Sequence, residues 1–443
     1  MAPPPEAESA TADAISVGGL APFRRRRKAP AASFLRKLLA FSGPGYLVAV
    51  GYMDPGNWAT GVAAGSTYGY ALLWVIVSAN LLAMFLQHLA AKLGIASDKD
   101  LARACRERYG PQVRTALWLL CETAIIACDL AEVLGAAIAL KLLFHVPMLL
   151  GVVLTAVEVL IILALQGRGA RRLEAIIIAT MAVIGLCFVA ELYLSAPPAL
   201  AVAKGLAPSL RILADPDMLY LAIGILGATV MPHNLYLHSS MVQTPRYART
   251  PSGRREAVRF ATLDLILALT LAIFVNAAIL ILAASAFHAR GFHSVASLED
   301  AYRLLAPSLG VGLASTLFAV ALLASGQNSA ITGTLAGQIV MEGFTDIRLP
   351  AWMRRLVSRA LAVVPAVIVL AAYGEGAATR LLIFSQVVLS LQLPFAVVPL
   401  VRLTSDRKIM GELVNSSTVR GAAYLACALL VALNAWMVIQ VVT

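Results

Sequence analysis

Residues 51–57, Gly-Tyr-Met-Asp-Pro-Gly-Asn, decide the fold, because they interrupt the apolar segment 43–65 at its middle. A second apolar segment, 218–242, is interrupted in the same way by Met231-Pro-His-Asn234. Proline removes a backbone donor and clashes with the preceding turn, so each helix should break there. Inside a membrane the freed backbone groups are tolerated only where they line a cavity or are buried in protein. The sequence therefore predicts two discontinuous membrane helices.

The composition indicates a membrane protein. Of 443 residues, 60% are hydrophobic and 13% are charged, whereas soluble domains are roughly 45–50% apolar and about 25% charged. The net charge of +11 could suit nucleic acid, but the basic residues lie in short loops and form no continuous patch, so no nucleic-acid partner is expected. Five cysteines are scattered without a CxxC pair, and no disulfide framework is expected.

Eleven apolar segments are long enough to cross about 30 Å of hydrocarbon, which takes about 20 residues. They are residues 43–65, 70–94, 114–143, 147–166, 173–195, 218–242, 258–287, 311–341, 356–373, 379–401 and 420–441. Residues 1–40, with a proline run and a basic run, are expected to be a disordered cytosolic tail without a signal peptide. Residues 41–443 are expected to form a single transmembrane domain.

The placement of Lys and Arg orients these segments. With the N-terminus in the cytoplasm, 29 of the 35 Lys and Arg residues fall on the cytoplasmic side and six fall outside. This distribution follows the positive-inside rule and predicts a multi-pass protein of the cell membrane whose C-terminus lies outside. The two interrupted segments are the first and the sixth, five helices apart, which is typical of inverted-repeat transporters with a midplane site. The predicted fold class is therefore all-α and polytopic, with broken helices 1 and 6.

Three residues at the interruptions are candidate metal ligands. Asp54 is an acidic residue at membrane depth, where function is the usual reason for a charge, although a structural ion pair would also explain it. Asn57 can turn its oxygen into the same gap or cap the helix that follows. Met231 would be core filler elsewhere, but before a proline and opposite Asp54 its thioether suits soft ions such as Mn²⁺, Fe²⁺, Co²⁺ and Cd²⁺ better than Mg²⁺ or Ca²⁺. The freed carbonyls of Gly51 and Ala228 are plausible further donors.

Other ionisable residues of the apolar segments are candidates for proton transfer. His233 could relay protons, bind metal or be a packed polar residue, and we favour the relay; His238 follows five residues later, off its face. Glu122, Asp129 and Glu132 share one helical face. Such an acidic stripe could conduct protons, form ion pairs with arginines such as Arg354 or Arg355, or do both. The candidate residues for the proton pathway, besides Asp54, are therefore His233, His238, Glu122, Asp129, Glu132, Arg354 and Arg355.

The Asp54-Pro-Gly-Asn57 and Met231-Pro-His-Asn234 pair resembles the Nramp family of proton-coupled manganese and iron transporters. Residues 326–338, Gly-Gln-Asn-Ser-Ala-Ile-Thr-Gly-Thr-Leu-Ala-Gly-Gln, are similar to that family's transport signature. They depart from it where Asn and Ala replace the small hydroxyl residues often found at the third and fifth places. The resemblance extends from about residue 42 to the C-terminus.

The resemblance implies a LeuT-type fold in which helices 1–5 and 6–10 are inverted repeats and helix 11 is peripheral. It implies a proton-coupled importer of Mn²⁺ or Fe²⁺, and of Cd²⁺, Co²⁺ and Zn²⁺, that works as a monomer and has no resident cofactor. The metal would be held by Asp54, Asn57, Met231 and the Ala228 carbonyl, with Gln386 approaching it in some states. Asp54, His233, Glu132 and Asp129 would match the proton route. Relatives that carry Mg²⁺ or Al³⁺ lack the methionine present here.

Two other classes of protein would account for part of this pattern. A sodium- or proton-coupled amino-acid transporter could share the architecture, but Asp54 would repel a substrate carboxylate. A membrane enzyme or metal sensor is disfavoured because the chain has no Walker loop, HExxH or haem CxxCH motif and no soluble signalling domain.

Overall fold

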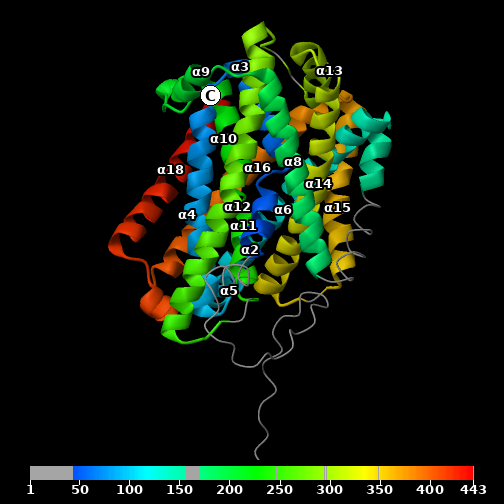
Figure 1. The fold of residues 1–443 in the computed structure, drawn as a ribbon. Coiled ribbons are helices and arrows are strands. Elements are labelled where there is room, and N and C mark those ends of the chain that lie inside the picture. The colour runs from blue at the N-terminus through cyan, green and yellow to red at the C-terminus, as the bar shows by residue number, and fades with distance from the viewer. Residues whose placement is uncertain are drawn as a thin grey trace, which may run out of the picture.

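The computed structural model describes residues 43–155, 170–244, 247–293, 295, 297–347 and 349–442. Within these ranges the chain consists of helices and their connections and contains no strand. The predicted tail 1–40 and much of the segment predicted at 147–166 lie outside the described residues; a helix begins at Met148 and is described to residue 155. The other helices are α2 (Pro44–Gly51), α3 (Pro55–Tyr68), α4 (Leu73–Ser97), α5 (Leu101–Arg108), α6 (Pro111–Phe144), α8 (Ala170–Ser195), α9 (Ala199–Gly205), η1 (Leu210–Leu213), α10 (Pro216–Val230), α11 (Pro232–Met241), α12 (Pro251–Ala286), η2 (His288–Arg290), α13 (Leu298–Leu309), α14 (Leu313–Thr345), α15 (Ala351–Tyr373), α16 (Ala377–Thr404), α17 (Arg407–Met410), η3 (Gly411–Leu413) and α18 (Ser417–Val442) (Figure 1).

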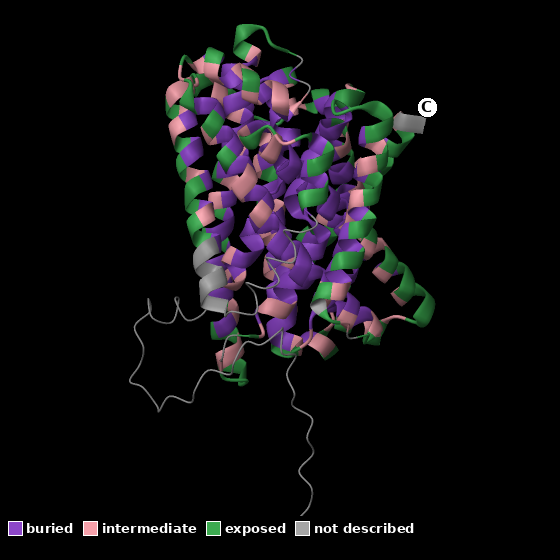
Figure 2. Cartoon of the chain, turned by 90° about the vertical axis from the view of Figure 1, so that its right-hand side faces the viewer, coloured by how far each residue is buried: buried purple, intermediate pink, exposed green. Residues whose placement is uncertain are grey.

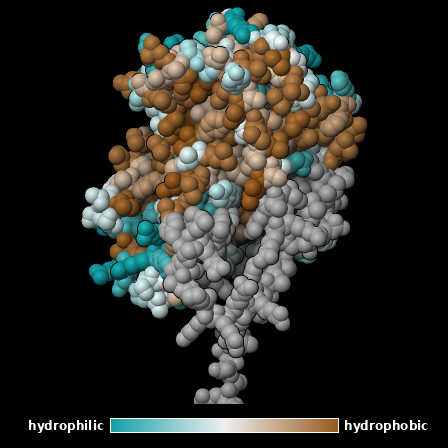
Figure 3. All heavy atoms as spheres, in the orientation of Figure 1, coloured by the Kyte–Doolittle hydropathy of each residue, from teal (hydrophilic) through white to brown (hydrophobic). Residues whose placement is uncertain are grey.

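The predicted all-helical, polytopic architecture is confirmed. Eight helical spans in the described part are long and apolar enough to cross a membrane; they involve α4, α6, α8, α10 with α11, α12, α15, α16 and α18. The predicted segments 43–65 and 311–341 correspond to the pair α2–α3 and to α14. Figure 3 shows that apolar residues cover most of the visible described surface away from its ends. Such a surface suits a hydrocarbon environment.

The first interruption ends one helix and begins another. α2 stops at Gly51, and α3 starts at Pro55, where a proline is tolerated because the first helical N–H needs no partner. Asp54 has extended backbone angles (φ −68°, ψ 165°), and its side chain caps α3 by accepting from the Asn57 N–H. The local sequence therefore produces the predicted break and fixes the Asp54 carboxylate at a helix N-terminus.

The second interruption is sharper. α10 ends at Val230 and α11 begins at Pro232, so the single residue Met231 lies between them. Its backbone has φ 34° and ψ 98°, a conformation that residues with a side chain rarely adopt. A residue held in such a region costs about 1–3 kcal/mol and persists only where its surroundings impose it.

Polar side chains from distant helices compensate the backbone at the first break. Asn276 of α12 donates its Nδ2–H to the carbonyl of Tyr52 at 2.9 Å, and Ser325 of α14 donates its hydroxyl to the carbonyl of Met53. Both carbonyls would otherwise be unpaired inside apolar protein, which costs several kcal/mol each. The break is therefore a built feature that α12 and α14 support.

The broken helices occupy the centre of the bundle. α3 packs against α12 and α10, while α6 packs against α14, α15 and α16. Figure 2 shows the buried residues concentrated at this centre, with the exposed ones on the outer faces. α18 contacts α16 and α10 at the periphery, as predicted for the last helix. Its C-terminal end lies at the same end of the molecule as α9 and opposite α5 (Figure 1).

Candidate metal-binding site

Asp54 and Asn57 form one half of the site. The Asp54 Oδ1 accepts from the Asn57 backbone N–H at 2.9 Å and from the Asn57 Nδ2–H at 2.8 Å. The other carboxylate oxygen, Oδ2, is buried and has no hydrogen-bond partner among the described residues. A buried carboxylate oxygen without a donor is costly. It is the atom of this half that is best placed to receive a cation.

The first turn before the second break supplies the opposite half. The Ala228 carbonyl accepts from the Asn57 Nδ2–H at 3.0 Å, and the Thr229 Oγ1 approaches the Asn57 Oδ1 at 3.5 Å. Asn57 therefore bridges α3 and α10 through its side chain alone. The predicted ligands Asp54, Asn57 and Ala228 are brought together by this geometry.

Met231 lies fully buried at the second break, and its sulfur is held in place. Asn234 donates its Nδ2–H to the Met231 Sδ at 3.5 Å from one turn further along α11. The thioether is thus a positioned acceptor as well as an apolar group. Gly51 makes this arrangement possible, because a Cβ at that position would lie 2.5 Å from the Asn234 Nδ2. The contact that the structure shows for Gly51 is therefore this close approach to Asn234. No hydrogen bond to the Gly51 carbonyl from another candidate ligand is found among the described residues.

Gln386 of α16 contacts both broken helices. A Cβ added at Gly56 would overlap its side-chain amide, and a Cβ added at Gly227 would overlap its backbone carbonyl. Gln386 donates from Nε2 to the Ser385 Oγ at 2.8 Å, while its Oε1 is buried without a described partner. The amide oxygen of Gln386 is therefore a further neutral donor next to the residues that flank Asp54.

The acidic stripe of α6 is paired with arginines of α15. Arg355 lies 2.5 Å from the Asp129 Oδ1 and 3.0 Å from the Glu132 Oε2, and all three side chains are at most 1% exposed. Arg354 reaches Glu122 at 3.0 Å nearer the surface. The ion pairs that the sequence suggested with Arg354 and Arg355 are therefore present. They compensate charges that would otherwise be prohibitive at this depth.

Arg359 completes this network one turn further along α15. It lies 3.6 Å from the Glu132 Oε2 and donates to the Asp129 backbone carbonyl at 3.3 Å. Ser329 of α14 donates to the other Glu132 oxygen at 3.0 Å. Arg359 and Ser329 are not among the residues predicted from the sequence, although an arginine inside an apolar helix is itself a signal of a buried acidic partner.

Residues 326–338 of α14, the stretch that is similar to the family's transport signature, pack on this network. A Cβ at Gly333 would lie 2.9 Å from the Glu132 Oε1, and a Cβ at Gly337 would overlap the Arg354 guanidinium. These glycines leave the space that the acidic and basic groups fill. The two departures from the family pattern, Asn328 and Ala330, do not touch the candidate ligands: Thr180 donates to Asn328 at 2.6 Å, and the Ala330 carbonyl accepts from Arg355 at 3.2 Å.

The two histidines of α11 have different surroundings. His233 is 1% exposed, its Nδ1 has no hydrogen-bond partner in the described chain, and its helix α11 packs against α6. His238 instead shares a hydrogen bond of 3.0 Å with Gln87, which donates to the Tyr52 hydroxyl at 2.8 Å. His233 therefore lies toward the acidic stripe, whereas His238 belongs to a separate polar chain that leads to the first break.

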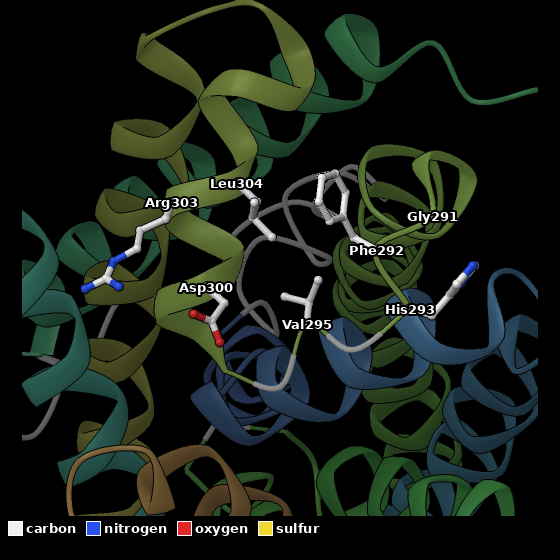
Figure 4. A pocket seen from close by; sticks show the side chains of 7 residues that line it. All are labelled: Gly291, Phe292, His293, Val295, Asp300, Arg303 and Leu304. Carbon is white, nitrogen blue, oxygen red and sulfur yellow. The ribbon is translucent and has the colours of Figure 1, made fainter.

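Donors of several kinds, rather than a cluster of classical ligands, define the site. Within the described residues no three His, Cys, Asp or Glu side chains gather as a metal-binding group. The five cysteines are buried and free. A cavity of about 310 Å³ near η2 carries His293, Asp300 and Arg303, but Figure 4 shows that these side chains point in different directions. The site at the two breaks is the arrangement suited to one cation.

Two helices broken around buried polar donors define a secondary-transporter class, in which discontinuous helices form the substrate site. Comparison with known proteins agrees with this class. The profile of Nramp, described as Natural resistance-associated macrophage protein-like, matches residues 45–440. The chain therefore belongs to the Nramp family.

Relatives and solved structures support this assignment. The divalent metal cation transporter MntH of Bradyrhizobium diazoefficiens is 58% identical over 399 residues, which cover 90% of this chain and 89% of that protein. MntH of Xanthomonas campestris pv. campestris is 60% identical over 398 residues, covering 90% of each chain. The Eremococcus coleocola manganese transporter in complex with an aromatic bis-isothiourea compound is 43% identical, with a TM-score of 0.84 and coverage of 94% of this chain and 90% of that one.

A more distant likeness concerns the fold alone. Mhp1, a nucleobase-cation-symport-1 family transporter in a closed conformation, is 14% identical, with a TM-score of 0.57 over 90% of this chain and 91% of that one. The fold is thus the predicted LeuT-type architecture with broken helices 1 and 6, and the chain is a transporter rather than an enzyme.

Proposed function

We propose that this protein imports divalent transition-metal ions, Mn²⁺ and Fe²⁺ foremost and also Cd²⁺, Co²⁺ and Zn²⁺, together with protons by alternating access. The observation that carries the proposal is that a carboxylate, an amide and a freed carbonyl meet between the two helix breaks, with a buried thioether at the second break. The names of the relatives, divalent metal cation transporter and manganese transporter, support it. The metal is the transported substrate.

The donor set favours ions of intermediate softness. Asp54 supplies the one negative charge of the proposed ligands, and Asn57, the Ala228 carbonyl and Met231 are neutral. A thioether gains little with Mg²⁺ or Ca²⁺, which prefer shells made of oxygen, but can bind Mn²⁺, Fe²⁺ and softer ions. The Gln386 amide is a further proposed oxygen donor when α16 moves toward the site. Gly51 stays a weaker proposal, because its contact is with Asn234.

Cation binding requires the Asn57 amide to turn. Its Nδ2–H₂ donates to the Asp54 Oδ1, beside the Oδ2 that is placed to receive the cation, and to the Ala228 carbonyl, which is itself a proposed ligand. A cation held by those oxygens would repel the N–H groups and attract the amide oxygen. We therefore propose that Asn57 alternates between donating two hydrogen bonds and offering its Oδ1 to the metal.

The proposed proton route leads from Asp54 through His233 to Glu132 and Asp129. The Asp54 Oδ2 and the His233 Nδ1 are buried without a hydrogen-bond partner among the described residues, and Glu132 and Asp129 share Arg355, so each group on this route has an atom or a charged partner available for a proton step. Arg355 contacts both α6 carboxylates, at 2.5 Å from Asp129 and 3.0 Å from Glu132. Glu122, Arg354 and Arg355 would form the end of the route, and His238 a side branch through Gln87.

For the protein as a whole, we propose the orientation given by the positive-inside rule, with the N-terminus in the cytoplasm and the C-terminus outside. The cell membrane is the proposed location, and the monomer is the proposed functional unit. The proposed cytosolic tail comprises residues 1–40.

Uptake by proteoliposomes tests the function. Vesicles containing the protein and an internal pH-sensitive dye are given Mn²⁺, Cd²⁺, Mg²⁺ or Ca²⁺ in parallel. Mn²⁺ and Cd²⁺ should enter with acidification, and the hard ions should not. Asp54→Asn should abolish metal uptake, since a desolvated dication would lack its counter-charge, whereas the matched control Asp217→Asn on the exposed start of α10 should not. Near wild-type Mn²⁺ uptake by Asp54→Asn would place the site elsewhere.

A further inference from the structure

A cavity of about 760 Å³ runs along the outer side of the bundle between α6, α16 and α18. On α16 its lining residues recur every three or four positions from Leu391 to Arg402, and on α18 they do so from Val431 to Ile439. This spacing marks one face of each helix. The cavity is therefore a groove between two continuous helix faces, which α6 closes with Val113 and Leu117.

A specific junction, beside Leu391, holds α18 against α16 along the groove. Pro394 cannot donate to the carbonyl of Ser390 four residues earlier. Asn434 of α18 donates its Nδ2–H to that carbonyl at 3.1 Å, and its Oδ1 accepts from the Ser390 hydroxyl at 3.1 Å. The proline thus frees an acceptor inside the membrane, and Asn434 binds it.

From this junction the groove extends toward the end of α16. The eleven steps along α16 from Leu391 to Arg402 correspond to a length of about 16 Å at 1.5 Å per residue. One leaflet contributes about half of the roughly 30 Å hydrocarbon core. The groove therefore has the depth of one leaflet, and its apolar wall includes Phe395 and Val398.

The far end of the groove is basic and polar. Arg402 is exposed there and lines the groove together with Tyr109, which Arg108 precedes in the chain. None of the ion pairs found in the described part of the chain includes Arg402 or Arg108. A guanidinium and a phenol that meet at the end of an apolar groove match the charge and the donors that a phosphate requires.

We propose that this groove binds an anionic phospholipid of the leaflet at the Arg402 end, which is the cytoplasmic leaflet in the proposed orientation. One acyl chain lies against α16 and α18, and the phosphate accepts hydrogen bonds from Arg402 and Tyr109. The two-part lining, apolar over one leaflet and cationic at its end, fits the two parts of a lipid. A second copy of the chain would need an acidic group opposite Arg402 and an apolar ridge beside it.

Native mass spectrometry of the full chain tests the site without measuring transport. The protein is released from nanodiscs of equal parts phosphatidylglycerol and phosphatidylcholine, and the lipids that stay bound are identified. The wild type should retain phosphatidylglycerol in preference. Arg402→Gln should lower that retention about tenfold, as expected for the loss of one charge-assisted hydrogen bond. The matched control Arg420→Gln, an exposed arginine of α18, should retain it.

A second pair of variants tests the apolar part. Val398→Trp fills the groove and should abolish retention of the lipid, whereas Leu425→Trp, at a position of α18 that is 62% exposed and does not line the groove, should not. If Arg402→Gln and Val398→Trp each retain as much phosphatidylglycerol as the wild type does, the proposal is overturned. Equal retention of both lipids by the wild type, or a dimer that Val398→Trp disrupts, would also overturn it. Failure of metal uptake would leave these lipid measurements unchanged, so the two proposals fail separately.

Discussion

Arg355 should be the residue of the buried charge network whose loss destabilises the protein most. It contacts Asp129 at 2.5 Å and Glu132 at 3.0 Å, with all three side chains at most 1% exposed. Removing one partner of a buried ion pair costs about 3–5 kcal/mol, because the remaining charge is uncompensated. Arg359 still lies 3.6 Å from Glu132 in Arg355→Gln. We therefore expect a loss near the lower end, about 3 kcal/mol of unfolding free energy.

Chemical unfolding in mixed detergent micelles measures this loss. The matched control is Arg420→Gln, which removes an exposed arginine and should change the unfolding free energy by less than about 0.5 kcal/mol. The double variant Arg355→Gln/Asp129→Asn removes one charge of each sign and should recover part of the loss. If Arg355→Gln unfolds within about 0.5 kcal/mol of the wild type, the reasoning about uncompensated charge is wrong.

The same variants test whether the acidic stripe of α6 only stabilises the fold or also carries protons. A scaffold needs balanced charge at these positions, whereas a proton route needs a carboxylate that can bind and release a proton. The double variant Arg355→Gln/Asp129→Asn should therefore regain stability but not proton-coupled Mn²⁺ uptake. Recovery of stability and of proton flux together would reduce the stripe of α6 to a structural network.

Two further predictions concern selectivity and pH. Met231→Ala should weaken Cd²⁺ most and Mn²⁺ less, by about tenfold for a ligand of roughly 1–2 kcal/mol, and should let Ca²⁺ compete; competition uptake checks this, and unchanged exclusion of Ca²⁺ contradicts it. Outside the membrane, the hydrogen bond from Lys141 lowers the pKa of Glu375 below its ordinary 4.5. A lowered carboxyl pKa stabilises the folded state above that ordinary value and loses the contribution as the pH falls. The stability difference between wild type and Glu375→Gln, at most about 1 kcal/mol for so exposed a pair, should therefore decline below pH 4.5 and vanish once the pH falls below the lowered pKa of Glu375. A difference that persists at still lower pH contradicts this.

The helix breaks could be predicted from sequence because their causes are local. Pro55 and Pro232 each follow a polar or sulfur-bearing residue within an apolar run, and proline acts on the turn that contains it. The acidic stripe was also predictable, since helical periodicity places Asp129 and Glu132 on one face whatever packs against it. An arginine next to another apolar segment then has few acidic partners to choose from besides this stripe.

The support of the breaks could not be predicted, because it depends on contacts between distant residues. Asn276 is 224 positions from Tyr52, and Ser325 is 272 positions from Met53. A single asparagine or serine in an apolar helix indicates a buried partner without saying which one. The same holds for Thr229, whose hydroxyl meets Asn57 across 172 positions.

A transporter of this kind must also change conformation after it has released its cargo, and Asn57 provides the groups for that step. Its two Nδ2 hydrogens satisfy the Asp54 Oδ1 and the Ala228 carbonyl at 2.8 and 3.0 Å. We propose that the amide thereby replaces the cation as the link between α3 and α10. In Asn57→Asp these donors are lost, and two carboxylates would face each other without a cation, which is unfavourable at low dielectric.

Asn57→Asp should therefore separate the loaded from the empty half of the transport cycle. With metal bound, the added negative charge strengthens the attraction, so metal binding should tighten. Without metal, repulsion between residues 54 and 57 should slow the return step, and net uptake should fall. Exchange of labelled for unlabelled Mn²⁺ across proteoliposomes uses only the loaded half and should be retained. If net uptake and exchange fall in the same proportion, Asn57 acts only as a ligand, because a link made by its N–H groups predicts a loss confined to the empty return.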